Sequence, residues 1–265
     1  MNTARFNVDS LLVEVFSNRG FMGVAAADAA VGILRGAIEK QGSARIVVAS
    51  APSQNELIAG LVKAPGMDWS KVTVFHMDEY VGVQASYPAS FRNYQQEHLL
   101  SKVSPKAFHG IRGEAPSAEE ECARYAALLT EAPIDLVCMG VGENGHIAFN
   151  DPPVADFADP QWVKIVELDE ICRQQQVNDG CFPDFDAVPK YAITLTCPAL
   201  MSGKALVCVV PGPRKADAVA AMLGVEISTS CPASILRRHA AATLYLDVDS
   251  AAKIDQNVNS SGAAT

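Results

Sequence analysis

The sequence predicts an α/β fold with three layers, α/β/α, in which a mostly parallel, Rossmann-like sheet lies between two layers of helices in a single domain. Short apolar runs rich in Val, Ile and Leu alternate with longer amphipathic segments, which is the pattern of helices that connect parallel strands. The apolar runs do not alternate with polar residues, so we expect strands that are buried on both faces. The 265 residues show no internal repeat and suffice for one sizeable core.

Each element is predicted from its own residues. Strands are predicted where apolar and β-branched residues stand together, and helices where apolar residues recur at helical spacing. Gly42 is a stop signal for the first helix, and Ser53 and Glu56 have capping-box spacing at the start of the second. The predicted order is strand 11–16, helix 23–42, strand 45–50, helix 53–62, strand 71–77, helix 90–100, helix 117–129, strand 135–140, strand 191–196, strand 204–210, helix 213–223 and strand 241–248.

The domain is predicted to cover residues 1–252. Residues 253–265 are mostly small and polar, and we expect them to form a flexible C-terminal tail.

The composition limits the class of partner and the compartment. The net charge of −9 argues against a nucleic-acid or anionic-membrane surface but permits a local cationic pocket for an anionic small molecule. The seven cysteines form no CxxC pair, so free buried thiols are expected in preference to a zinc site or a catalytic cysteine. No signal-peptide pattern is present and no uninterrupted apolar run reaches about 18 residues, so we expect a cytoplasmic protein.

Two adjacent acids follow the predicted strand 71–77. Asp78 and Glu79 stand where the run "VTVFHM" ends, and ligands of open parallel sheets bind beyond the carboxyl ends of the strands. An Asp-Glu pair in this place also occurs as a simple turn or helix cap. The position nevertheless makes Asp78 a candidate reacting group.

The second candidate site is the loop "VGENGHIAFNDPP", which directly follows the predicted strand 135–140. His146 and Asp151 are five residues apart, which suits a general acid/base and a carboxylate that orients it. Gly145 lets the backbone turn sharply and approach a ligand closely. A single loop histidine is often structural, but two such motifs after two buried strands are more specific than either motif alone.

The segments "FHMDEYVG", "GVGENGHIAFNDPP", "VPKYAITL" and "SCPASIL" resemble successive motifs of the glucosamine-6-phosphate deaminase/isomerase family, whose sister group is the 6-phosphogluconolactonases. The resemblance extends from about Val47 to Asp247. It implies an enzyme that opens the ring of an amino-sugar phosphate, moves a proton between C2 and C1, and releases ammonia. It implies no metal and no organic cofactor.

The resemblance also implies roles for five residues. Asp78 carries the proton between the two carbons, and a neighbouring Glu79 together with partial burial is expected to raise its pKa. His146 opens the ring with Asp151 as its carboxylate partner. Asn144 stands where many members of the family have Asp, and Glu79 helps to hold the site.

The phosphate-binding half resembles the family less closely. Where the family has a Gly- and Thr-rich loop that opens a helix, this chain has "ASAPSQNELI". Ser50, Ser53 and Gln54 are the expected donors to a phosphate at this helix start.

The cations that would bind the phosphate match the family only in part. Lys215 matches a family lysine. Asn178 stands at the register of a family arginine, which leaves Arg173 as a candidate phosphate ligand.

The predicted function is aldose–ketose isomerisation with deamination, most simply of glucosamine 6-phosphate to fructose 6-phosphate and ammonia. The alternatives are a 6-phosphogluconolactonase-like hydrolase, a deaminase acting on a different sugar, and a sugar-phosphate sensor. The only partner predicted with a defined chemistry is a small-molecule sugar phosphate. A homo-oligomer is left open.

Overall fold

The computed structural model describes residues 1–255, and residues 256–265 lie outside the described part. Most of the predicted C-terminal tail is therefore outside it. Within the remaining three residues, the ammonium of Lys253 lies 2.7 Å from the Asp217 carboxylate, and Ile254 packs against the core.

An eight-stranded sheet forms the middle layer, in the order β1-β2-β11-β10-β7-β3-β4-β6. The β1–β2 pair is antiparallel, and every other neighbouring pair is parallel. The predicted fold class is thus confirmed. The strands are β1 (Asn2–Val8), β2 (Leu11–Phe16), β3 (Ala44–Val48), β4 (Val72–His76), β6 (Ala107–His109), β7 (Leu136–Met139), β10 (Ala205–Val210) and β11 (Ala242–Asp247).

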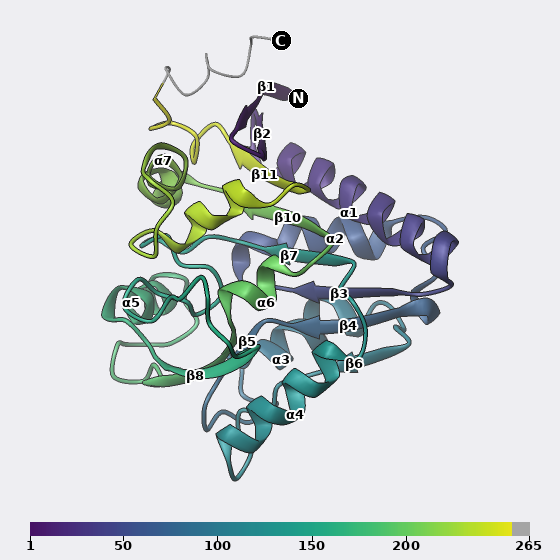
Figure 1. Cartoon of the computed structure of the whole chain (residues 1–265), viewed down its shortest axis with the longest axis vertical. Coiled ribbons are helices and arrows are strands. Elements are labelled where there is room, and N and C mark those ends of the chain that lie inside the picture. The colour runs from purple at the N-terminus through teal and green to yellow at the C-terminus, as the bar shows by residue number, and fades with distance from the viewer. Residues whose placement is uncertain (256–265) are drawn as a thin grey trace.

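Helices cover both faces of this sheet (Figure 1). Successive strand residues lie on opposite faces: Ile46 belongs to the buried cluster that includes residues of α1 and α2, whereas Val47 belongs to the cluster that includes residues of α4, α6 and α7. This explains why the strands read as continuous apolar runs. The helices are α1 (Arg19–Gln41), α2 (Asn55–Lys63), α3 (Phe91–Gln95) with a π-helical turn at Gln96–Leu100, α4 (Ala118–Thr130), α5 (Glu170–Asn178), α6 (Cys197–Met201) and α7 (Ala216–Gly224).

Helix α1 is long and apolar enough to cross a membrane by length and composition alone. In the fold it packs on the sheet and on α2. A Cβ at Gly23 would lie 2.2 Å from the Cβ of Glu56, and a Cβ at Gly60 would lie 2.4 Å from that of Ala27. The two helices therefore approach each other closely through their glycines, and α1 is a core helix of the domain.

A second, three-stranded antiparallel sheet has the order β5-β9-β8. The strand predicted at 191–196 exists, but the expectation that it joins the parallel sheet is wrong, because it pairs on both sides with strands of the small sheet. Asp78 is the first residue of β5 and pairs with Thr194 of β9. The strands are β5 (Asp78–Tyr80), β8 (Val163–Glu167) and β9 (Tyr191–Leu195).

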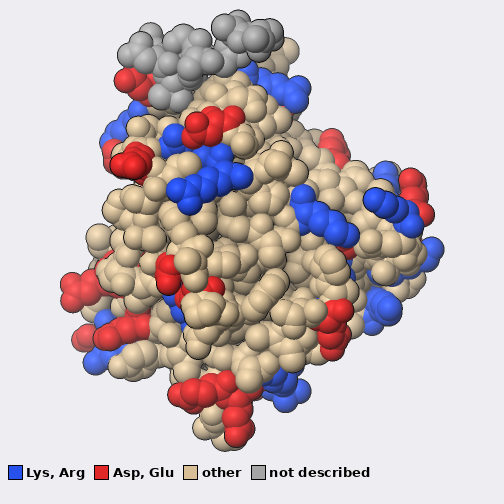
Figure 2. Space-filling model, viewed as in Figure 1, with Lys and Arg blue, Asp and Glu red and all other residues tan. Residues whose placement is uncertain are grey.

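The charged side chains on the face shown in Figure 2 are scattered, with acidic residues gathered at its lower end, over the start of α4. That helix carries Glu119, Glu120 and Glu121 in its first turn, and the hydroxyl of Ser117 caps it by accepting the Glu120 backbone N–H. Acids at a helix start are stabilised by the helix dipole, so local structure accounts for this acidic end.

Candidate active site

A cavity of about 310 Å³ opens beyond the carboxyl ends of the central strands. In Figure 1, α5 lies on the side toward which β3 and β10 point, and it forms one wall of this cavity. Asp78 and His146 both line it. The two motifs that the sequence singles out therefore face one space.

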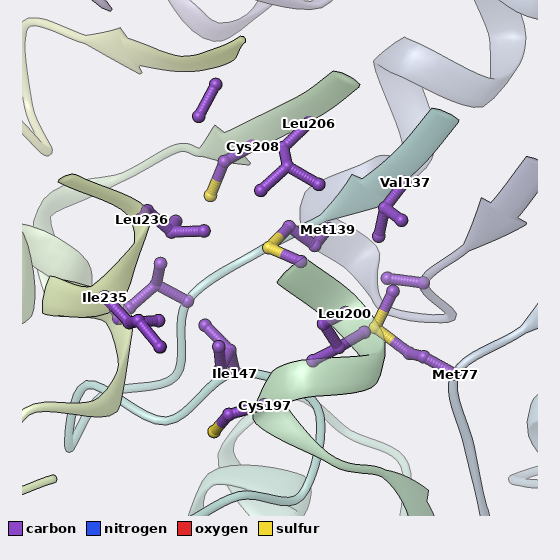
Figure 3. Packing of buried hydrophobic residues seen from close by; sticks show 14 of the residues in the cluster. Met77, Val137, Met139, Ile147, Cys197, Leu200, Leu206, Cys208, Ile235 and Leu236 are labelled. Carbon is purple, nitrogen blue, oxygen red and sulfur yellow. The ribbon is translucent and has the colours of Figure 1, made fainter. Parts of the chain in front are cut away.

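The apolar core fixes the backbone next to both residues. Met77 precedes Asp78 and Ile147 follows His146, and both apolar side chains belong to the cluster in Figure 3. Met77 is 2% exposed and Ile147 is fully buried. Asp78 and His146 are thus held at the cavity because the residue next to each of them is packed in the core.

Asp78 occupies a buried position with little compensation for its charge. Its side chain is 7% exposed, and within residues 1–255 no hydrogen bond to its carboxylate is found. Burial, and to a lesser extent the charge of Glu79, raises the pKa of Asp78 well above its usual value. Such a carboxylate has a strong affinity for a proton, as a group that takes and returns one requires.

Glu79 points away from the cavity and ties β5 to the start of α3. Its carboxylate accepts the Ser90 hydroxyl at 2.7 Å, the Phe91 N–H at 3.1 Å and the Arg92 N–H at 3.0 Å. Burial raises the pKa of Glu79, and these hydrogen bonds oppose the rise. Because Phe91 lines the cavity, Glu79 acts on the site through the position of α3.

His146 is held by an amide and a carboxylate together. Its Nδ1 lies 2.8 Å from Asp151 Oδ1 and 2.8 Å from Asn144 Oδ1. A carboxylate oxygen only accepts, so Nδ1 carries the proton and the neutral ring has its lone pair on Nε2. Asn144 also donates from Nδ2 to Asp151 Oδ1 at 2.9 Å. The three side chains form a closed hydrogen-bonded unit that fixes the tautomer.

Asp151 is charged within this unit. Burial acts to raise its pKa, but the neighbouring His146 and the hydrogen bonds from His146 and Asn144 outweigh burial and lower the pKa. The carboxylate can therefore stabilise a positive charge on the imidazole when Nε2 takes up a proton.

Gly145 contributes to the turn and not to the cavity wall. Its φ of +82° is in the left-handed region, and a Cβ here would lie 2.8 Å from Cys231 Sγ. The Gly145 carbonyl also accepts the Ala233 N–H at 2.8 Å. The "SCPASIL" segment thus supports the histidine loop from behind, and the expectation that Gly145 contacts a ligand is not supported.

The predicted phosphate donors Ser50, Ser53 and Gln54 all line the cavity. Gln54 donates to Ser53 Oγ at 3.1 Å, and its own Oε1 is buried without a partner in the described chain. Ser50 accepts from Gln95 at 2.9 Å, which ties the loop to α3. Pro52–Gln54 forms a 3₁₀ turn ahead of α2.

The capping box predicted from Ser53 and Glu56 does not form. The N-cap of α2 is Gln54, without a side-chain cap. Instead, Glu56 binds the guanidinium of Arg19, with contacts of 2.8 and 2.7 Å. Arg19 lines the cavity and also donates to the Pro52 carbonyl at 3.0 Å.

Lys215 is the cavity's unpaired ammonium among the described residues. It is 8% exposed, and no hydrogen bond or ion pair to it is found within residues 1–255. Burial lowers its pKa, and the nearby Asp179 and Glu143 partly oppose this. The adjacent Arg214 is already paired, with Asp179 at 2.5 Å and Glu143 at 3.5 Å.

The proposed phosphate contact of Arg173 is not supported by its position. Arg173 does not line the cavity. Its guanidinium donates to the carbonyls of Phe185 and Val188 at 2.8 and 2.9 Å and lies 4.0 Å from the centre of the Phe185 ring. Arg173 stabilises the segment that follows α5.

Sequence reasoning missed several cavity residues. Helix α5 was not predicted, so Gln175, Gln176 and Asp179 were not assigned to the site. The doublet Arg214–Lys215 was visible in the sequence, but nothing local to Arg19 indicates that the start of α1 lies beside the Pro52 turn.

One group of potential metal ligands lies at the site. The ligand atoms of His146, Asp151 and Cys172 are within 4.8 Å of one another. Burial raises the pKa of Cys172 well above its usual value, so the thiol keeps its proton, whereas a metal ligand would need the thiolate. His146 Nδ1 and the Asp151 carboxylate are already hydrogen-bonded to each other. The three side chains therefore fit a hydrogen-bonded unit better than a metal centre.

The sequence of this chain is similar to that of known enzymes. The family model described as glucosamine-6-phosphate isomerases/6-phosphogluconolactonase matches residues 21–245. The chain is 34% identical over 221 residues to a glucosamine-6-phosphate deaminase of Bacillus cytotoxicus, covering 83% of this chain and 82% of the relative. It is 36% identical over 204 residues to that of Listeria welshimeri, covering 77% and 85%.

Solved structures show the same fold. A monomeric glucosamine-6-phosphate deaminase superposes with a TM-score of 0.84 at 26% identity, covering 91% of this chain and 99% of that one. A 6-phosphogluconolactonase of Shewanella baltica gives 0.73 at 20% identity, covering 89% and 97%, which supports the fold alone. The chain belongs to the glucosamine-6-phosphate isomerase/6-phosphogluconolactonase family.

Proposed function

We propose that the protein converts glucosamine 6-phosphate and water to fructose 6-phosphate and ammonia. The observation that carries the proposal is the pair of Asp78 and His146 on one cavity, the first with a raised pKa and the second with a free Nε2. The relatives named glucosamine-6-phosphate deaminase, at 34% and 36% identity, support the substrate.

Ring opening is the first step, and His146 performs it. Nε2 takes the proton from the anomeric hydroxyl and returns it to the ring oxygen as the C1–O5 bond breaks. While the imidazole carries the extra proton, the Asp151 carboxylate at 2.8 Å stabilises its charge.

Proton transfer between carbons is the second step, and Asp78 performs it. The carboxylate removes the proton from C2 of the open-chain aldehyde while the aldehyde oxygen takes up a proton that the C2 ammonium gives up, which gives an enolamine. Asp78 then returns its own proton to C1. The product is a ketimine at C2. Water adds to this C=N bond, and the collapse of the adduct releases ammonia and leaves the ketone of fructose 6-phosphate. A buried base is suited to this step, because its proton affinity is raised by its surroundings.

The phosphate group lies at the opposite end of the cavity in this proposal. Lys215 supplies an ammonium without a partner among the described residues, and Ser53 and Gln54 supply polar side chains from the turn before α2. Arg19 and Arg214 add positive charge at this end, partly offset by their carboxylate partners. A charge-assisted hydrogen bond to phosphate contributes about 1.5–3 kcal/mol.

The protein is proposed to act as a soluble enzyme of the cytoplasm on a small-molecule sugar phosphate. The parallel sheet buried between helices, with α1 packed in the core, supports a soluble enzyme. The cytoplasmic setting rests on the composition and on the seven free cysteines.

The test is to incubate the purified protein separately with glucosamine 6-phosphate and with 6-phosphogluconolactone. We expect ammonia and fructose 6-phosphate from the first substrate and no accelerated hydrolysis of the second. Hydrolysis of the lactone without ammonia release from the amino sugar would refute the proposal. Binding of glucosamine 6-phosphate with zero turnover would indicate a sensor instead.

A further inference from the structure

Three consecutive glutamines on α5 have three different environments. Gln174 is exposed and donates to Asn178 Oδ1 at 3.1 Å. Gln175 is buried, and its Oε1 accepts the Glu143 backbone N–H at 2.9 Å, which ties α5 to the histidine loop. Gln176 is 7% exposed and lines the cavity.

The amide of Gln176 is oriented by a buried tyrosine. The Tyr80 hydroxyl donates to Gln176 Oε1 at 2.8 Å. Because the oxygen of the amide is bound to Tyr80, the NH₂ group is the end left to face the cavity. Within the described residues, no hydrogen bond from Gln176 Nε2 to the protein is found. A buried amide that lines a cavity with an unused donor is suited to bind a ligand oxygen.

Tyr80 itself is held firmly. It is fully buried, and its ring lies 4.9 Å from that of Phe91, 5.5 Å from Phe149 and 5.3 Å from Phe182, measured between ring centres. Burial raises the pKa of Tyr80, so its hydroxyl keeps the proton that it donates. The orientation of Gln176 is therefore set by a packed aromatic cluster.

Gln176 lies between the reacting end of the cavity and its proposed phosphate end. Tyr80 stands two residues after Asp78 on β5, so both side chains lie on the same face of that strand. One helical turn after Gln176, Asp179 is bound to Arg214, the neighbour of Lys215. The cavity wall formed by α5 thus extends from the strand of Asp78 to the proposed phosphate end.

We propose that Gln176 determines substrate specificity: its N–H, aimed by Tyr80, donates to the hydroxyl oxygen on C3 or C4 of the sugar chain, between the reacting carbons and the phosphate. This inference rests on the proposed function for the identity of the sugar. A site that hydrogen-bonds a substrate hydroxyl rejects an analogue that lacks it, because its own polar group is then left without a partner. Gln176 contacts substrate, and Tyr80 is a positioning residue that acts through it.

The experiment measures binding and turnover separately. The probe for binding is the open-chain analogue 2-amino-2-deoxyglucitol 6-phosphate, with its 3-deoxy and 4-deoxy forms, titrated calorimetrically. The proteins are the wild type, Gln176→Leu, Gln176→Glu, Tyr80→Phe and the matched control Gln174→Leu. Gln176→Glu keeps an acceptor for the Tyr80 hydroxyl but loses the donor, and circular dichroism checks that each variant folds.

We expect the wild type to bind one of the two deoxy analogues about tenfold more weakly than the parent analogue. Gln176→Leu and Gln176→Glu should bind the parent and that deoxy analogue equally, because the donor is gone. Tyr80→Phe should retain part of the discrimination, with a larger rise in KM than fall in kcat for glucosamine 6-phosphate. Gln174→Leu should behave as the wild type.

The two proposals fail in different ways. A wild type that binds the analogue but releases no ammonia refutes the proposed reaction alone. An active wild type whose discrimination survives in Gln176→Leu refutes the role of Gln176 alone. A wild type that neither binds the analogues nor releases ammonia refutes both.

Discussion

Gly142 leaves space for the ring of His146 that no other residue could leave. A Cβ at position 142 would lie 2.2 Å from His146 Cε1 and 2.3 Å from Nε2. The backbone N–H of Gly142 also donates to the His146 carbonyl at 2.9 Å. The imidazole ring of His146 thus packs directly against the Cα of Gly142.

Gly142→Ala should therefore displace the imidazole and abolish most of the activity. We expect kcat to fall by about 10²–10⁴-fold, the usual contribution of a general acid/base, with the fold retained. Gly36→Ala is the matched control, because within residues 1–255 no atom outside its own stretch of helix backbone lies within 4 Å of its added Cβ. In the middle of α1 it should stabilise the protein by about 0.5–1 kcal/mol. Steady-state kinetics and thermal unfolding measure both effects, and equal activity in the two variants would contradict the packing argument.

Asp78→Asn should lose activity and gain stability. The loss in kcat should reach about 10²–10⁴-fold, since no proton can be shuttled. The gain follows from linkage: a carboxyl group whose pKa is raised on folding binds its proton more tightly in the folded chain. Its contribution to stability is full below the pKa of the unfolded chain and is lost as the pH rises through the raised pKa.

At neutral pH, the Asn variant avoids this loss, and we expect a gain of about 0.5–2 kcal/mol in the free energy of unfolding. Urea unfolding at pH 4 and at pH 8 measures it. The gain should be larger at pH 8, and a gain found only at pH 4 would contradict the predicted pH dependence.

Glu79→Gln should shift the acidic side of the pH profile of kcat/KM. The charge of Glu79 is the second cause of the raised pKa of Asp78, so removing it lowers that pKa and moves the acidic limb to lower pH. Glu114→Gln is the control: the Arg92 guanidinium lies 3.4 Å from Glu79 and also binds Glu114, and Glu114 is not among the causes of the Asp78 shift. A limb that moves equally in both variants would show that the effect comes through Arg92.

Lys215→Met should raise KM for the phosphorylated substrate by about tenfold or more, as expected for one charge-assisted hydrogen bond. Lys253→Met removes the same charge from the surface, where Lys253 pairs with Asp217, and should leave KM within twofold. Competition by inorganic phosphate gives a second measurement, since phosphate should inhibit the wild type more strongly than Lys215→Met. Equal inhibition of both would place the phosphate elsewhere.

The sequence predicts the six inner strands of the main sheet and the reacting groups because their signals are local, whereas the edge strands β1 and β6 are not among the predicted elements. Buried apolar runs mark the central parallel strands, and the motif positions of Asp78 and His146 follow directly from the ends of two such runs. Strand β5 has three residues, too few to show a period. Strand β8 was not predicted although it is as long as β9, and β9 shows its strand character without showing its partners. Pairing between segments more than 100 residues apart is decided by tertiary packing.

The phosphate end could be predicted only in part for a similar reason. Ser50, Ser53 and Gln54 lie close together in the chain, so their shared position was visible. Arg19 reaches the cavity because α1 happens to begin beside that turn, and Arg173 is directed elsewhere by two carbonyls and an aromatic ring. The sequence does not reveal where a charged side chain such as that of Arg173 points when the helix that carries it is not predicted.

The two carbonyl contacts of Arg173 have a mechanical consequence. They join α5 to the chain as far as Val188, so Gln175, Gln176 and Asp179 share a support that one buried guanidinium holds in place. Local opening of such a unit requires all of its contacts to break together. Amide hydrogens of α5 and of the segment up to Val188 should therefore exchange with solvent at one common rate, because the two segments open together as one rigid wall of the cavity.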